Sequence, residues 1–252
     1  MAENGLLDVT GRVALVTGAS SGLGRRAASV LAASGARVVG VARRAEALVE
    51  WQAEVGDNGA VIAHDLADRD GLADLARAAA LPFGAPDIVV HAAGINTRQA
   101  ADDVTPEGWD VTLSLNLSAP FFLSQHLVPA MKQKGWGRIV NFASLQSFRA
   151  FPGGIAYGAS KGGVAQMTRA MAEAWSRDGI VVNALAPGFI RTELTAAVFD
   201  DPERAARNAA QTAIGRNGEV DDLDGPLMFF CSEASKYVTG QIMMVDGGFT
   251  AK

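Results

Sequence analysis

A tyrosine and a lysine lie four residues apart in the stretch Tyr157-Gly158-Ala159-Ser160-Lys161. On a helix, residues with this spacing project from the same face, so the phenol and the ammonium group would lie side by side. A free tyrosine ionises near pH ~10, and a neighbouring cation favours the phenolate and lowers that pKa. A large enough lowering would let Tyr157 exchange a proton near neutral pH. The pair therefore predicts a proton-transferring group.

A tyrosine and a lysine at this spacing are common in proteins, and Ser144 is the residue that makes a catalytic role for the pair more specific. It is the last residue of a predicted strand, 138–144, and doubly wound sheets bind their ligands at the carboxyl ends of their strands. The chain returns to Tyr157 thirteen positions later. A hydroxyl beside the phenol can hydrogen-bond a substrate oxygen and hold it for proton exchange.

A glycine-rich turn follows the first predicted strand and precedes a predicted helix, with the sequence Thr17-Gly18-Ala19-Ser20-Ser21-Gly22-Leu23-Gly24. Glycines let the backbone approach a pyrophosphate, whose charge is met by free N–H groups at the start of the helix. The position of the turn between strand and helix favours dinucleotide binding over a simple connection.

The end of the second predicted strand, Val41-Ala42-Arg43-Arg44, indicates which dinucleotide is bound. An acid there would bind the ribose 2′-hydroxyl, whereas a small residue followed by a guanidinium can pair with a 2′-phosphate. NADP(H) is therefore the expected cofactor. The alternative is that Arg43 and Arg44 only solvate the start of a helix.

Runs of β-branched and apolar residues alternate with longer helical stretches along the whole chain. Seven of these runs are candidate strands: 12–18, 37–42, 60–65, 87–93, 138–144, 180–187 and 241–247. This alternation predicts an α/β fold, a doubly wound seven-stranded parallel sheet of the Rossmann type with helices on both faces. No repeat, low-complexity tract or linker marks a boundary, so residues 1–252 are expected to form one domain.

The composition excludes several classes of partner. A net charge of -5, with no long run of like charge, argues against nucleic acid and anionic membranes. The N-terminus has no basic region before an apolar stretch, so a cytoplasmic protein is expected. Cys231 lies in the apolar stretch LMFFC and is expected to be buried, and the scattered histidines His64, His91 and His126 predict no metal site.

Taken together, the glycine turn, Ser144, Tyr157 and Lys161 resemble the short-chain dehydrogenase/reductase family, and the likeness covers nearly the whole chain. It implies that Tyr157 donates or accepts the substrate proton, that Lys161 lowers its pKa and binds the nicotinamide ribose, and that Ser144 orients the substrate. Asn116 matches the asparagine that supports a water relay behind the lysine. The implied reaction exchanges the pro-S hydride of the nicotinamide with a carbonyl or secondary alcohol, and it needs no metal.

The resemblance also implies a set of cofactor-binding residues at the carboxyl ends of the strands. Besides Tyr157 and Lys161 these are Gly18, Ser20, Ser21, Gly22, Leu23, Gly24, Arg43, Asp65, Leu66, Ala93, Gly94, Pro187, Gly188, Ile190 and Thr192. One departure is His91-Ala92-Ala93-Gly94, where the family usually has Asn-Asn-Ala-Gly. We expect this substitution to be structural, with His91 as a core histidine whose hydrogen bonds are satisfied.

Substrate contacts are expected near Arg98, along the segment from Phe189 to about Gln211, and from five residues in particular: Ser144, Gln146, Arg149, Tyr157 and Phe189. Arg149 could hold a carboxylate, and the stretch ASLQSFRAF resembles gluconate 5-dehydrogenase-like members, which favours a sugar acid or a polyol. A 3-oxoacyl carrier-protein reductase is the alternative enzyme, although Ser21 stands where such enzymes often carry a basic residue.

Two further expectations concern the class of protein and its assembly. The non-enzyme alternative is a catalytically silent dinucleotide-sensing or scaffolding module that keeps the fold. The family commonly forms tetramers through the helices that carry Asn116 and Tyr157, so the resemblance predicts a homotetramer.

Overall fold

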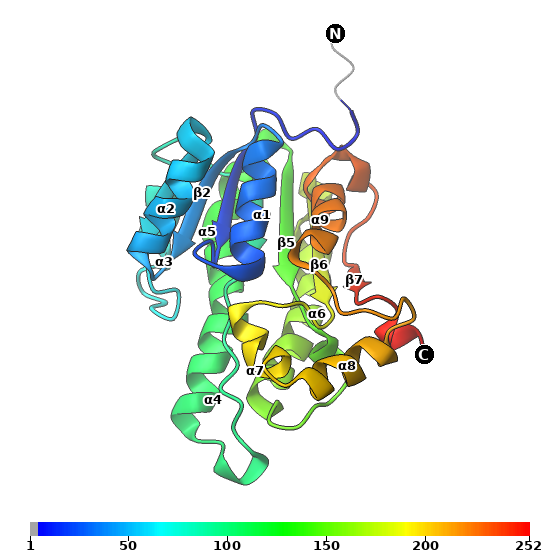
Figure 1. Ribbon diagram of the computed structural model, residues 1–252. Coiled ribbons are helices and arrows are strands. Elements are labelled where there is room, and N and C mark those ends of the chain that lie inside the picture. Colours follow the sequence, from blue (N-terminus) through cyan, green and yellow to red (C-terminus); the bar gives the residue numbers. More distant parts are fainter. Residues whose placement is uncertain (1–4) are drawn as a thin grey trace.

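The computed structural model describes residues 5–252, in which a seven-stranded parallel sheet runs through the middle of the molecule (Figure 1). Its strand order is β3-β2-β1-β4-β5-β6-β7. The strands are β1 (Val13–Thr17), β2 (Arg37–Ala42), β3 (Gly59–Ala63), β4 (Ile88–His91), β5 (Gly137–Phe142), β6 (Ile180–Pro187) and β7 (Ile242–Val245). The order reverses between β1 and β4, which opens a crevice at the carboxyl ends of these two strands. Residues 1–4, which the sequence analysis included in the domain, lie outside the described residues.

Helices cover both faces of the sheet, and each face buries its own apolar cluster. One face is covered by α1 (Gly22–Ala33), α2 (Ala45–Val55) and α9 (Asp224–Cys231), and the other by α3 (Leu72–Ala79), α5 (Ala119–Lys134) and α6 (Ile155–Trp175). The remaining helices, α4 (Pro106–Leu113), α7 (Ala196–Phe199) and α8 (Pro202–Gln211), extend beyond the strand ends, away from the N-terminus (Figure 1). Among the described helices, none combines the length and the apolar character needed to cross a bilayer.

The predicted doubly wound fold is confirmed, and its local signals act as the sequence indicates. Thr105 caps α4 by accepting a hydrogen bond from the Gly108 N–H, and Asp201 caps α8 in the same way. Cys231 is fully buried, as expected. The predicted strand 138–144 was too long, because β5 ends at Phe142 and Ser144 begins a separate turn.

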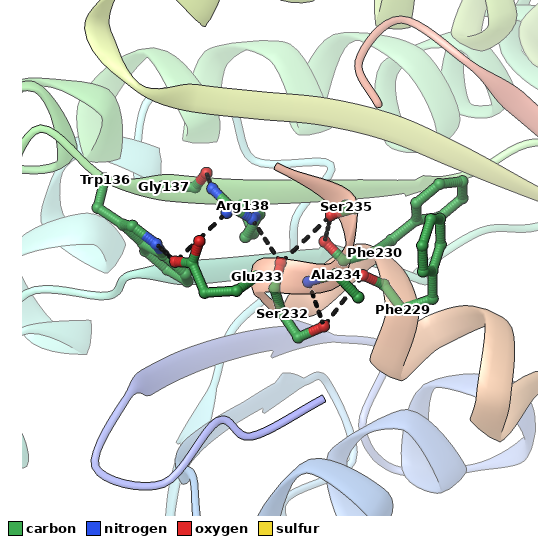
Figure 2. A network of polar contacts seen from close by, with 9 residues as sticks. All are labelled: Trp136, Gly137, Arg138, Phe229, Phe230, Ser232, Glu233, Ala234 and Ser235. Carbon is green, nitrogen blue, oxygen red and sulfur yellow. Dashed lines mark hydrogen bonds and ion pairs between the residues drawn. The ribbon is translucent and has the colours of Figure 1, made fainter. Parts of the chain in front are cut away.

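A buried arginine closes the amino-terminal edge of the sheet (Figure 2). Arg138, the second residue of β5, donates from Nε to the Ser232 carbonyl oxygen at 3.0 Å and from Nη1 to the Gly137 carbonyl oxygen at 2.9 Å. Its guanidinium lies 4.4 Å from the centroid of Trp136, whose Nε1 donates to Glu233. Burial lowers the pKa of Arg138. This network ties the start of β5 to the segment after α9, at the far end of the strands from Ser144.

Candidate active site

Helix α6 brings Tyr157 and Lys161 together, as their spacing predicts. The Lys161 ammonium nitrogen lies 5.7 Å from the centroid of the Tyr157 ring. It donates a hydrogen bond to the Phe142 carbonyl oxygen at 2.6 Å, so the lysine is anchored to the end of β5. Lys161 is only 5% exposed, and this burial lowers its pKa to about 8. Its charge is therefore held close to the phenol and away from bulk water.

The pKa of Tyr157 corrects the prediction made from the sequence. We expected Lys161 to lower it, whereas the structure raises it, because burial of the phenol disfavours the charged phenolate. A hydrogen bond with the Ser144 side chain and the charge of Arg98 act in the opposite direction, and they offset part of this effect. Tyr157 is therefore a protonated phenol at neutral pH.

Ser144 opens a 3-10 turn, Leu145–Ser147, directly after β5. Its hydroxyl accepts a hydrogen bond from the Gln146 N–H at 3.1 Å. Ser147, which the sequence analysis did not single out, accepts from the Ser144 N–H at 3.3 Å and donates to the Lys161 carbonyl oxygen at 2.7 Å. Ser147 thus fastens the turn that carries Ser144 to the helix that carries Tyr157.

Asn116 lies in a five-residue π-helix, Ser114–Ser118, between α4 and α5. Its amide brackets the backbone of Ile95, accepting from the N–H and donating to the carbonyl oxygen, both at 2.9 Å. Nδ2 also donates to Ser160 Oγ at 3.0 Å, so Asn116 joins the loop after β4 to α6. π-Helices occur often at functional sites. The water relay implied for Asn116 remains a prediction.

A cleft of about 460 Å³ lies beside these groups, over the carboxyl ends of β1, β2 and β4. Gly94, which lines the cleft, lies next to the lysine, since a Cβ there would be 3.7 Å from Lys161 Nζ. Gly18 has φ +73° and packs against the backbone of Ala93. At the start of α1, Ser21 makes no side-chain cap and the first turn holds no acid, which leaves N–H groups free to meet a phosphate. The cleft therefore fits a dinucleotide.

Most of the residues expected to bind the cofactor line this cleft. They are Gly18, Ser20, Ser21, Gly22, Leu23, Gly24, Arg43, Asp65, Leu66, Ala93, Gly94 and Thr192. Five of the expected residues do not line it: Tyr157, Lys161, Pro187, Gly188 and Ile190. The Ile190 side chain is buried in the core. Ala42 and Arg44, which the sequence analysis considered together with Arg43, line the cleft too. The sequence analysis missed His64, Ala92, Ile95, Leu115, Glu193 and Leu194. All of these except Leu115 lie within two residues of a predicted cofactor-binding one, and this adjacency was the available signal.

The residues expected to contact the substrate divide into two groups. The Ser144 side chain acts on the pKa of Tyr157, and a Cβ at Gly158 would lie 3.6 Å from Gln146 Oε1, which places Gln146 against the first turn of α6. Phe189 instead packs edge-on against Phe249 at 5.6 Å between ring centroids, in a cluster with Phe151. The Arg149 guanidinium lies 5.5 Å from the centroid of the same Phe249 ring.

Arg98 is the arginine whose charge reaches Tyr157. It is the one non-glycine residue in the described part of the chain with a positive φ, 53°. Its guanidinium donates to the Leu194 carbonyl oxygen, and its N–H bonds to Asn96 Oδ1 at 3.1 Å. A strained backbone held in this way is typical of functional positions.

His91, at the end of β4, is the core histidine that the sequence analysis expected. It is buried, and its Nε2 lies 2.8 Å from Ser124 Oγ. Burial lowers its pKa to about 3.

Comparisons with known proteins agree with this geometry. A family model described as Enoyl-(Acyl carrier protein) reductase matches residues 18–250. The gluconate 5-dehydrogenase of Gluconobacter oxydans (strain 621H) is 39% identical over 99% of both chains. The 2-dehydro-3-deoxy-D-gluconate 5-dehydrogenase of Bacillus subtilis (strain 168) is 38% identical over 96% of both. The structure of a gluconate 5-dehydrogenase from Burkholderia cenocepacia J2315, in complex with NADP and tartrate, is 34% identical with a TM-score of 0.93, covering 100% of each chain. The chain belongs to the short-chain dehydrogenase/reductase family.

Proposed function

We propose that this protein is an NADP(H)-dependent oxidoreductase that interconverts a ketone and a secondary alcohol on a sugar acid, with Tyr157 transferring the proton. The observation that carries this proposal is the placement of Tyr157 beside Lys161 on α6, with Lys161 anchored to the end of β5, at the same edge of the sheet as the cofactor cleft. The names of the relatives support the substrate class, since they act on gluconate and a deoxy derivative of it.

NADP(H), when bound, supplies or accepts the hydride. The glycine turn and the start of α1 would hold its pyrophosphate, and Arg43 and Arg44 would hold its 2′-phosphate. The chain's own residues handle the proton at the substrate oxygen. Because burial keeps Tyr157 protonated at neutral pH, the phenol is ready to donate during reduction. Oxidation of the alcohol requires that Tyr157 first lose this proton, so oxidation gains from alkaline pH.

Arg98 is the residue that we propose to hold the substrate carboxylate. Its charge acts on Tyr157, whereas the Arg149 guanidinium lies over an aromatic ring. An arginine and a carboxylate form strong charge-assisted hydrogen bonds with a fixed geometry. The relative whose structure contains tartrate, a dicarboxylate, supports an anionic substrate.

The test is a substrate panel run in both directions with NADPH and NADH. Gluconate, a neutral polyol of similar length and a 3-oxoacyl thioester separate the sugar-acid proposal from the polyol and carrier-protein alternatives. We expect turnover with gluconate and NADP, and a loss of about tenfold or more in kcat/KM for gluconate in Arg98→Gln but not in Arg149→Gln. Greater turnover of the thioester would contradict the substrate class. Cofactor binding without turnover of any panel member would favour the dinucleotide sensor.

The assembly and the location are further parts of the proposal. A homotetramer built through α4, α5 and α6 would cover the exposed side chains Val111 and Phe122. A Cβ at Gly162 would meet only the Ser147 carbonyl oxygen, at 4.0 Å, while Gly163 already packs inside the protomer against Leu117. Light scattering that gave only a monomer would contradict the tetramer. A cytoplasmic location is supported by a buried cysteine, Cys231, that needs no oxidising compartment.

A further inference from the structure

A carboxylate from the far side of the cofactor cleft reaches the basic pair that follows β2. Glu193 begins a 3-10 turn, Glu193–Thr195, and its two oxygens meet two terminal nitrogens of Arg44 at 3.2 and 3.0 Å. Arg44 also donates to Ser20 Oγ, from Nε at 3.3 Å and from Nη2 at 3.2 Å. The pKa of Glu193 is lowered by its hydrogen bond to Arg44 and, to a smaller degree, by one to Ser21. The Arg44 guanidinium thus contacts both the Glu193 carboxylate and the Ser20 hydroxyl.

These groups have the chemistry that a 2′-phosphate requires. Arg44, Ser20 and Ser21 line the cleft at the end of β2, the edge that faces the adenosine ribose in doubly wound folds. Arginine and hydroxyl donors suit a phosphate as well as a carboxylate. Arg43 lines the same cleft. Glu193 therefore occupies Arg44, one of two cations that could bind an anion here. The other cation, Arg43, takes part in none of the ion pairs within residues 5–252.

We propose that Glu193 is a specificity-setting latch: its carboxylate occupies the 2′-phosphate site on Arg44, and a cofactor with a 2′-phosphate displaces it, whereas one with a 2′-hydroxyl does not. This inference rests on the proposed use of NADP(H). The latch weakens NADP(H) binding relative to NAD(H), because phosphate and carboxylate compete for the same donors and repel each other.

The segment around Glu193 also reaches the substrate side of the cleft. The turn that carries Glu193 is held rigid by Thr195, whose Oγ1 accepts from the Thr192 N–H at 2.9 Å. The next residue, Leu194, accepts the hydrogen bond from Arg98, and the charge of Arg98 acts on Tyr157. One turn therefore carries Glu193 toward the 2′-phosphate site and also holds Arg98 near Tyr157.

The expected change in affinity for the 2′-phosphate follows from the solvent exposure of the Glu193–Arg44 ion pair. The Arg44 and Glu193 side chains are 50% and 65% exposed, and an exposed ion pair contributes little, so removing the latch should tighten binding of a 2′-phosphate about two- to fivefold.

Calorimetric titration with adenosine 2′,5′-bisphosphate and with 5′-AMP tests the latch without turnover, since neither ligand carries a nicotinamide. We expect Glu193→Gln to bind the bisphosphate about two- to fivefold more tightly than the unchanged protein, with no change for 5′-AMP. Arg44→Ala should bind the bisphosphate less tightly, again with no change for 5′-AMP. The matched control is Glu203→Gln, an exposed carboxylate on α8 with an ion pair to Arg207, and it should leave both affinities unchanged.

The outcomes separate the latch from the proposed function. An unchanged protein that binds 5′-AMP as tightly as the bisphosphate would overturn the choice of NADP(H), and the latch with it. If the bisphosphate is preferred but Glu193→Gln gains nothing, or gains equally for 5′-AMP, the latch alone is wrong.

Discussion

At the scale of single residues, burial moves the pKa values of Tyr157 and of its neighbour Lys161 in opposite directions, away from each other. The pKa of Tyr157 rises above its usual value and that of Lys161 falls to about 8, because each loses solvation in its charged form. A nearby cation thus lowers the pKa of the phenol by less than desolvation in the same pocket raises it. The neutral phenol is the form that donates a proton to a carbonyl oxygen during reduction.

The tyrosinate absorbance of the protein tests this pKa directly. The chain has two tyrosines, and the second, Tyr237, is 99% exposed and supplies the reference signal. Because the pKa of Tyr157 is raised, Tyr157→Phe should remove the part of the absorbance change that occurs at the highest pH. If Tyr157→Phe instead removes the part of the absorbance change at the lowest pH, the Lys161 charge lowers the pKa of Tyr157 by more than burial raises it.

The burial of His91 should make the stability of the folded protein depend on pH in the acid range. The pKa of His91 falls from the ordinary 6.5 to about 3 on burial, so the unfolded chain binds a proton that the folded protein does not. Stability is therefore lost as the pH falls below 6.5, and between pH 7.5 and 5 this one group accounts for about 2 kcal/mol. Urea unfolding of His91→Asn should lack this part of the loss. An identical acid dependence in the variant and in the unchanged protein would mean that His91 does not contribute.

At the scale of elements, the site is held by short, irregular segments between the regular ones. The π-helix Ser114–Ser118 lets Asn116 grip the loop after β4, and the 3-10 turn Leu145–Ser147 leads from β5 back to α6. Neither segment has a period that a sequence pattern reveals. Both are fixed by tertiary hydrogen bonds from single side chains.

Ser147 should act as a positioning residue. Ser147→Ala removes the hydrogen bonds to Lys161 and to Ser144, and we expect kcat to fall about three- to tenfold with little change in cofactor affinity. Ser147→Thr, which keeps a hydroxyl, should recover part of the rate. The matched control is Ser235→Ala, since Ser235 is buried and bonds the Phe230 carbonyl oxygen at 3.1 Å at the other end of the sheet. A fall in kcat as large in Ser235→Ala would reduce the Ser147 effect to general destabilisation.

At the scale of the whole molecule, the sheet separates stability from chemistry. The groups that act on the substrate lie at the carboxyl ends of the strands, while the Arg138 network holds the amino end, where β5 meets the segment after α9 (Figure 2). The two ends share the same buried strands, but no residue of that network lines the cofactor cleft.

Arg138→Ala should therefore destabilise the protein and spare catalysis. It leaves a cavity and removes the guanidinium donor of the Ser232 carbonyl, which keeps only the Ser235 hydroxyl at 3.3 Å, and this should cost about 2–4 kcal/mol of unfolding free energy. Arg138→Met fills the volume and should cost less. Denaturant unfolding at one protein concentration, with kcat/KM measured alongside, checks both. A loss of activity in Arg138→Ala that matches its loss of stability would mean that the two ends are coupled.

The sequence predicts the sheet well, because most of its strands are buried along nearly their whole length and are therefore apolar runs. It also predicts that Tyr157, Lys161 and Ser144 belong to the site. Tyr157 and Lys161 lie one turn apart on a single helix, and Ser144 lies just beyond the end of a strand. It does not predict the Glu193–Arg44 contact, since those residues are far apart in the chain and meet only when the segment after β6 folds over the cleft. Nor does it predict the direction of the Tyr157 pKa, which depends on how deeply the phenol is buried.

The central claim is that Tyr157 transfers the proton at the end of the NADP(H) cleft, and Tyr157→Phe tests it most directly. We predict that this variant binds NADPH as tightly as the unchanged protein, because the phenol oxygen is not a main anchor for the dinucleotide. Its turnover in ketone reduction should fall about a hundredfold or more, because the phenol is the group that donates the proton to the substrate oxygen. Turnover within about fivefold of the unchanged protein, with NADPH binding intact, would contradict the account.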